Sequence, residues 1–290
     1  MPANLEALRS FRLDHIEYGY SRKDVILYSL GVGAGANPTD TADLAYVYED
    51  GLRTLPTFGA ILAYPGFWIR EHPELGVDWR MALNGEQGIT LFRPIPPEGK
   101  VVGRLRVEHL IDKGPGNDLL IQSIREIADG NTGEPICNVA NTIVCRKSGV
   151  NISTASQSKR ASPAMPERPA DLACVQPTLT QAALIYRLSG DLNPLHVAPD
   201  VAKSAGYAKP ILHGAATWGI VAHGLLKALC QSDDTLVRTY FARFTAPVYP
   251  GDTLTTQVWL LDPGVAAFRT EVVDRHAVVM DFGRFEFKPA

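Results

Sequence analysis

The pattern of apolar and polar residues divides the chain into two similar blocks. In each block, a segment with helical spacing is followed by a long apolar run and then by stretches of alternating character. Helical spacing of apolar residues indicates an amphipathic helix, and alternation indicates a half-buried strand. The helical spacing covers residues 21–33 and 181–188, and the apolar runs cover residues 54–69 and 210–226.

The alternating stretches predict four strands in each block. Segments rich in Pro, Gly and Asp separate them and are typical of turns. The predicted strands cover residues 88–92, 100–111, 119–127 and 136–145 in the first block, and residues 237–244, 253–261, 266–273 and 278–287 in the second.

Aromatic, proline and glycine residues recur at matching places in the two blocks, which indicates an internal duplication. Each copy then reads as one long buried helix wrapped by an antiparallel sheet, an α+β fold. The matched residues are separated by 152 to 155 positions; they are Phe92, Pro94, Pro97, Gly99, Pro56 and Gly59 in the first block, and Phe244, Pro247, Pro250, Gly251, Pro210 and Gly214 in the second.

The segment between the blocks is poor in apolar residues and rich in Ser, Ala and Pro. That composition is typical of an extended or disordered linker. We therefore predict a first domain at residues 1–150, a linker at 151–170 and a second domain at 171–290.

The two apolar runs differ in how well they suit a helix. The first contains Pro65-Gly66, and a proline inside a helix costs about 3 kcal/mol. We expect the central helix of the first copy to be broken or short, which would leave room for a bulky ligand. The second run contains small residues such as Gly219, which would let strands approach the helix closely.

Composition restricts the partners of the protein. The 290 residues carry a net charge of −3, which argues against nucleic acid or an anionic membrane surface as the main partner.

No apolar run reaches the roughly 20 residues that span a bilayer. The N-terminus lacks a signal-peptide pattern and the C-terminus lacks a peroxisomal SKL-type address, so we expect a cytoplasmic protein. Exposed sheet edges favour a homodimer.

Candidate chemistry lies in the loop before the second apolar run. Asp191 and His196 are five residues apart, and Gly190 with Asn193-Pro194 predicts a turn between helices. A carboxylate and an imidazole on one tight loop can hold a water molecule and exchange protons with it. Asp and Asn are also common turn formers, so these residues alone fit a surface turn as well.

Gly214 follows His213 at the start of the second apolar run. If that run is a helix, the Gly214 N–H lies at its N-terminus, where developing negative charge on a carbonyl oxygen is favoured. Together these groups suggest the addition of water across a double bond conjugated to a thioester, with no metal and no cofactor. His213 and His223 lie 17 and 27 residues after His196, which matches no familiar zinc signature.

The stretch YRLSGDLNPLH…AGYAKPILHG closely resembles the hydratase-2 family of (R)-specific 2-enoyl-CoA hydratases, the MaoC-like dehydratases. The segments YGYSRKDVILYSLGVG, LPTFGAI, NGEQGITLFRPIPPEGK and ARFTAPVYPGDTL extend the resemblance over nearly the whole chain. It implies a double hot dog fold with two long central helices and an acyl-CoA thioester substrate. By the resemblance, Asp191 and His196 are the catalytic pair and the Gly214 N–H serves the thioester oxyanion.

The resemblance also implies residues that contact the acyl-CoA. Lys113 would meet a CoA phosphate as a point charge. The first half has no His after Asn37-Pro38, so one active site per chain is expected, and that half would accommodate the acyl group. The implied substrate-binding residues are Asn84, Gly85, Lys113, Leu192, Asn193, Pro194, Leu195 and Phe244.

One position departs from the family pattern. Where the family usually has His-Gly-Glu-Gln, this chain has Asn84 before Gly85, Glu86 and Gln87. An asparagine keeps hydrogen-bonding capacity but does not titrate. The departure therefore puts substrate affinity or chain-length preference in question.

The function predicted from the sequence is reversible syn hydration of trans-2-enoyl-CoA to (3R)-3-hydroxyacyl-CoA. Which of Asp191 and His196 is the base stays open, because coupled groups can share the role. The alternatives are an acyl-CoA thioesterase on the same fold and a non-catalytic acyl-CoA binding protein. Acyl-chain length, and a branched or steroid side chain, also stay open.

Overall fold

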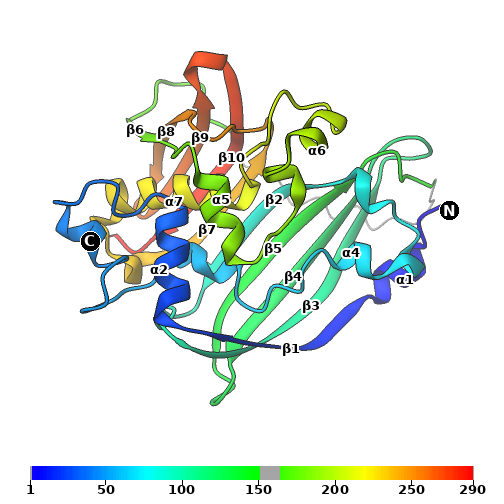
Figure 1. Ribbon diagram of the computed structural model, residues 1–290, viewed down its shortest axis with the longest axis horizontal. Helices are drawn as coiled ribbons and strands as arrows, with labels where there is room; N and C mark the ends of the chain where they lie inside the picture. The colour runs from blue at the N-terminus through cyan, green and yellow to red at the C-terminus, as the bar shows by residue number, and fades with distance from the viewer. Residues whose placement is uncertain (1, 151–163, 290) are drawn as a thin grey trace.

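Ten strands form one continuous antiparallel sheet in the computed structural model, which describes residues 2–150 and 164–289. Figure 1 shows the strands of the first half spread out as a broad curved surface. The strands are β1 (Arg12–Tyr20), β2 (Ala82–Leu91), β3 (Gly99–Asp112), β4 (Leu119–Asp129), β5 (Pro135–Cys145), β6 (Leu172–Pro177), β7 (Val237–Phe244), β8 (Thr253–Asp262), β9 (Val265–Val272) and β10 (Ala277–Phe287).

The strand order reads the same from both edges of the sheet. It runs β1-β3-β4-β5-β2 and then β7-β10-β9-β8-β6, so each strand of the first half has a counterpart in the second. β2 and β7 pair in the middle, with Glu86 opposite Arg243. Such a repeated order is what an internal duplication produces. The domain limits 1–150 and 171–290 stay a prediction, and residues 151–163 of the proposed linker lie outside the described residues.

All eight strands predicted from alternation are present; their ends differ by at most two residues, except that β2 begins six residues before the predicted start at residue 88. The sequence analysis missed β1 and β6, which begin each copy and form the two edges of the sheet. No position in β6 is fully buried, and only the last residue of β1 is. Edge strands with little buried surface carry a weak apolar pattern, which explains the omission.

The helices gather mainly over the second half of the sheet and beside the junction of the halves (Figure 1). α7 is the longest of them in the described residues, and α2 and α5 lie in front of it in this view. The α-helices are α1 (Leu5–Ser10), α2 (Arg22–Gly31), α3 (Thr41–Leu44), α4 (Trp68–Glu71), α5 (Ala182–Tyr186), α6 (Pro199–Ser204) and α7 (Gly214–Cys230). The 3-10 helices are η1 (Pro56–Ala60), η2 (Pro73–Leu75), η3 (Trp79–Met81), η4 (Arg187–Ser189), η5 (Pro194–His196), η6 (Asp234–Leu236) and η7 (Val273–Arg275).

Of the two long central helices in the predicted fold, only the second is long. In the first copy the chain forms η1, leaves helical geometry, and forms α4 after the Pro65-Gly66 pair. Ala63 and Gly66 both have positive φ angles, 48° and 70°, which no right-handed helix contains. The central helix of the first copy is therefore broken, as expected.

α7 is buried along most of its length because small residues let its neighbours approach. A Cβ atom on Gly219 would lie 2.6 Å from a methyl carbon of Val32, which follows α2. A Cβ on Gly224 would meet Gln176 of β6, whose amide donates to the carbonyl oxygen of Ile220 in α7. The predicted close approach to this helix is confirmed.

Buried polar contacts also join the two halves. Glu86 of β2 accepts two hydrogen bonds from Arg243 of β7. His223 of α7 lies 2.7 Å from the Asp43 carboxylate of α3. The Glu86–Arg243 contact joins the two central strands, and the His223–Asp43 contact holds α7 against the first half.

Candidate active site

The loop between α5 and α6 folds as its turn residues predict. Gly190 has a φ of 117°, a conformation that favours glycine, and ends η4. The Asn193 side chain accepts a hydrogen bond from the Leu195 N–H at 3.0 Å and so caps η5. The Asp191 carboxylate accepts from the Asn193 N–H at 3.1 Å, which fixes the direction of that side chain.

The structure brings Asp191, His196 and His213 together. One side-chain atom from each of the three lies within 4.8 Å of the others. The rings of His196 and His213 stack with 3.7 Å between their centroids. His213 Nε2 donates to the backbone carbonyl oxygen of Asp191 at 3.1 Å. His213, which the sequence analysis left without a role in the reaction, therefore holds the loop in place.

The hydrogen bonds of His196 assign its tautomer. Its Nδ1 lies 2.9 Å from the backbone carbonyl oxygen of Ile211, and a carbonyl only accepts, so Nδ1 carries the proton. Burial lowers the pKa of His196 below its usual value of 6.5. The ring is therefore neutral at neutral pH, and its Nε2 offers a lone pair.

Gly214 is the first residue of α7, directly after His213. N–H groups in the first turn of a helix have no acceptor within the helix, so the Gly214 N–H finds none in α7, and its role as an oxyanion donor stays a prediction. A Cβ on Gly214 would lie 3.6 Å from the ring of Phe244, so this predicted ligand-contacting residue lies beside the N-terminus of α7.

The remaining predicted contacts fall into two places. Asn84 and Gly85 lie near the start of β2, the strand that pairs with β7. A Cβ on Gly85 would lie 2.6 Å from a methyl carbon of Val144, so glycine is needed there for packing. Lys113 lies in the exposed turn between β3 and β4. β3 is separated from β2 by β4 and β5 in the sheet, and the contact of Lys113 with the ligand stays a prediction.

The predicted lining residues of the loop are mostly exposed. Leu192 is 61% exposed, and Asn193 and Pro194 are exposed, whereas Leu195 is half-buried. Leu192 is thus an apolar side chain that the protein itself does not cover. The roles of these four residues stay a prediction.

Two tyrosines near the loop were not identified from the sequence. Tyr186 is buried, and its ring centroid lies 5.1 Å from that of His213. Tyr64 comes from the first half, just before Pro65-Gly66; burial, together with the negative charge of Asp191, raises its pKa to about 12. The helix-breaking pair was the one sequence signal that marked this segment as irregular.

His213 gives a prediction for stability. Its burial and the nearby His196 lower its pKa from 6.5 to about 4. As pH falls, His213 of the unfolded chain is protonated at a higher pH than His213 of the folded protein. The free energy of unfolding should therefore fall by about 3 kcal/mol as pH drops from about 6.5 to 4. Urea denaturation across that range should show a shallower pH slope for His213→Gln. The exposed His276→Gln is the control, and an unchanged slope in His213→Gln would contradict the assignment.

Solved structures define the class of fold. The chain is similar to a MaoC-like dehydratase from Phytophthora capsici, with a TM-score of 0.86, 28% identity and 99% of each chain covered. It is also similar to a Mycobacterium tuberculosis protein described as having a double hot dog fold, with a TM-score of 0.59, 15% identity, and 99% of this chain and 98% of that chain covered. The predicted α+β double hot dog is confirmed.

Sequence comparisons define the family. Residues 18–147 match the MFE-2 hydratase 2 N-terminal domain, and residues 161–280 match the MaoC like domain. The chain is 34% identical to the peroxisomal enoyl-CoA hydratase 2 of Arabidopsis thaliana, over 96% of this chain and 93% of that one. It therefore belongs to the hydratase 2 family of MaoC-like dehydratases, as the resemblance indicated.

Three earlier expectations stay predictions. One relative is named as peroxisomal, so the comparisons do not support the cytoplasmic location. No helix in the described ranges is long and apolar enough to cross a membrane. The homodimer is untested. The distances between Asp191, His196 and His213 would also suit a metal ion, so the metal-free reaction is likewise untested.

Proposed function

We propose that this enzyme catalyses the reversible syn hydration of trans-2-enoyl-CoA to (3R)-3-hydroxyacyl-CoA. The observation that carries the proposal is the convergence of Asp191 and His196 beside the N-terminus of α7. The family supports it, since the relative and the solved structure described above are named as a hydratase and a dehydratase.

The proton chemistry follows from the state of the two side chains. Neutral His196 offers Nε2 as the base that removes a proton from the bound water. The Asp191 carboxylate accepts a hydrogen bond from the other O–H of the water, which stays intact, and so orients the oxygen toward C3 of the substrate. The oxygen bonds to C3, and the proton held by His196 passes to C2 on the same face, which gives syn addition.

The thioester carbonyl is the second reacting centre. As the water oxygen bonds to C3, the electrons of the double bond move toward the carbonyl oxygen, which becomes an enolate oxygen. The Gly214 N–H and the positive end of the α7 dipole stabilise that oxygen. The reverse reaction uses the same groups and eliminates water from the 3-hydroxyacyl thioester.

The rest of the predicted set would bind the CoA portion and the acyl group. Phe244 packs beside Gly214 and would contact the thioester region. Asn84 and Gly85 would lie next to it on the paired strand β2. Exposed Lys113, farther along the same end of the sheet, would meet a CoA phosphate.

A panel of trans-2-enoyl-CoAs tests this function. We expect loss of absorbance at the enoyl thioester band, and chiral analysis should find the (3R)-3-hydroxyacyl-CoA. A thiol reagent should detect no release of free CoA. Release of CoA thiol would identify a thioesterase, and saturable binding without any absorbance change would identify a non-catalytic binding protein.

A further inference from the structure

One buried cation takes no part in the proposed chemistry. Arg125, in β4, is 3% exposed. Burial lowers its pKa to about 10, so the guanidinium is still charged at neutral pH. One of its N–H groups donates to the carbonyl oxygen of Ala60, the last residue of η1. Arg125 therefore caps the short helix that replaces the central helix of the first copy.

This charge has no anionic partner in the described part of the chain. Its Nε–H has no hydrogen-bond acceptor there. The ionisable groups that act on it are Tyr64 and Cys137, and burial raises the pKa of each to about 12. Both are thus neutral at neutral pH. An unpaired buried charge is costly to maintain. A ligand with a negative charge would supply the missing counter-charge and offset that cost.

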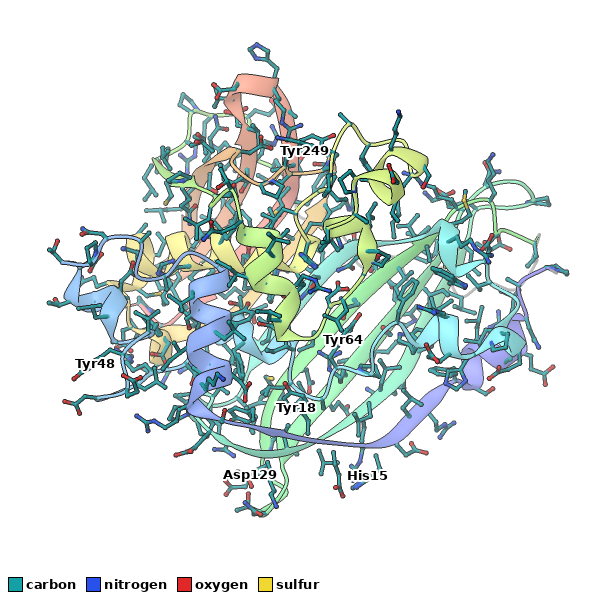
Figure 2. The ribbon with its side chains drawn as sticks, viewed as in Figure 1. His15, Tyr18, Tyr48, Tyr64, Asp129 and Tyr249 are labelled. Atoms are coloured by element: carbon teal, nitrogen blue, oxygen red, sulfur yellow. The ribbon has the colours of Figure 1, made fainter. Side chains whose placement is uncertain are left out.

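Tyr64 connects this cation with the catalytic loop. Its ring centroid lies 5.6 Å from the Arg125 guanidinium carbon, a cation–π distance. The same side chain is mostly buried but keeps 39% of its surface exposed, and it is close enough to Asp191 for that carboxylate to raise its pKa further. Figure 2 shows Tyr64 in front of the strands of the first half, near the end of α5. An acyl chain that leaves the catalytic pair toward the first half would pass Tyr64 and approach Arg125.

We propose that Arg125, with Tyr64 above it, binds a carboxylate at the far end of the acyl chain. The substrate class then includes 2-enoyl-CoAs whose chain ends in a carboxylate. A planar guanidinium with an unused N–H matches a carboxylate in charge and shape. This inference rests on the proposed hydratase function and adds a preference for the distal end of the substrate.

The test compares matched substrates. Enoyl-CoAs of increasing length are prepared in pairs, one ending in a methyl group and the other in a carboxylate, and kcat/KM is measured for each. At the length that spans from Asp191 to Arg125, the wild-type enzyme should prefer the carboxylate. In Arg125→Met the ratio of the two kcat/KM values should fall by about tenfold or more, since charge-assisted hydrogen bonds are the strong ones.

Two further variants keep the test decisive. Arg104→Met changes an exposed arginine of the neighbouring strand β3 and should leave the ratio unchanged. Tyr64→Phe keeps the ring over Arg125 and removes the hydroxyl, so the carboxylate preference should persist. If Arg125→Met fails to fold, the kcat/KM ratios of the wild-type enzyme and of Tyr64→Phe still test the proposal, because the absence of a carboxylate preference in them would overturn it.

The outcomes separate this inference from the proposed function. Hydration of methyl-ended substrates with no carboxylate preference at any length would overturn the inference and leave the hydratase assignment standing. An unchanged ratio in a folded Arg125→Met would overturn it as well. If the enzyme hydrates neither the methyl-ended nor the carboxylate-ended substrates, that result would instead contradict the proposed hydratase function.

Discussion

Asp191→Asn and His196→Gln should each lower kcat for enoyl-CoA hydration by roughly a hundredfold to ten-thousandfold, the usual contribution of a positioned acid or base. Each substitution keeps the approximate size of the side chain. His196→Gln removes the proposed base, and Asp191→Asn removes the negative charge that would orient the water. The measurement is the initial rate of absorbance loss at the enoyl thioester band, with circular dichroism to establish that the variants fold.

Asp200→Asn is the matched control for the carboxylate. Asp200 is an exposed residue of α6, a short distance along the chain from the catalytic loop. The same chemical change there should leave kcat within a few-fold of wild type. Near wild-type kcat in Asp191→Asn or in His196→Gln would exclude the proposed pair.

The double variant adds information on how the two residues act. If both hold and deprotonate one water molecule, losing either side chain disables the other. The kcat of the double variant Asp191→Asn/His196→Gln should then be only slightly below that of the less active single variant, because the effects of substituting groups that act as a unit are strongly non-additive. Losses that multiply would instead show two independent roles.

The loop that carries Asp191 and His196 could be predicted from the sequence because its geometry is local. Gly190, Asn193 and Pro194 specify the turn by their own backbone preferences, and the structure places Asp191 and His196 within reach of each other. The strands with alternating buried faces were predictable for the same reason, since each face is set by neighbouring residues.

Contacts between distant segments could not be predicted in this way. The bond from His213 to the Asp191 carbonyl joins residues 22 positions apart and depends on how α7 meets the loop. Tyr64 comes from the other half of the chain, and nothing in its local sequence places it near Asp191 or above the guanidinium of Arg125. The pairing of β2 with β7, which makes one sheet of the two copies, is likewise a tertiary event.

The N-terminus of α7 combines both kinds of information. The apolar run predicted a helix, and the glycine at its start predicted a donor. The structure adds that His213, just before the helix, holds the Asp191 backbone and stacks on His196. His213 therefore joins the start of α7 to both Asp191 and His196, which gives the Gly214 N–H a defined position relative to the proposed catalytic pair.

Gly214→Pro should lower kcat by roughly a hundredfold to a thousandfold, the cost of removing one oxyanion donor. Proline lacks the N–H but suits the first position of a helix. His213 already has φ −56° and ψ 137°, the extended geometry that a residue before proline adopts. The substitution thus removes the donor at a place where the backbone accommodates it.

Gly214→Ala separates the donor from the added bulk. Its Cβ would sit 3.6 Å from the ring of Phe244, an ordinary contact, and the N–H remains. We expect Gly214→Ala to keep most of its activity. We expect Gly214→Pro to lose kcat with little change in KM, because the N–H acts mainly on charge that develops in the transition state. Equal losses in the two variants would show that crowding beside Phe244, and not the missing donor, limits the reaction.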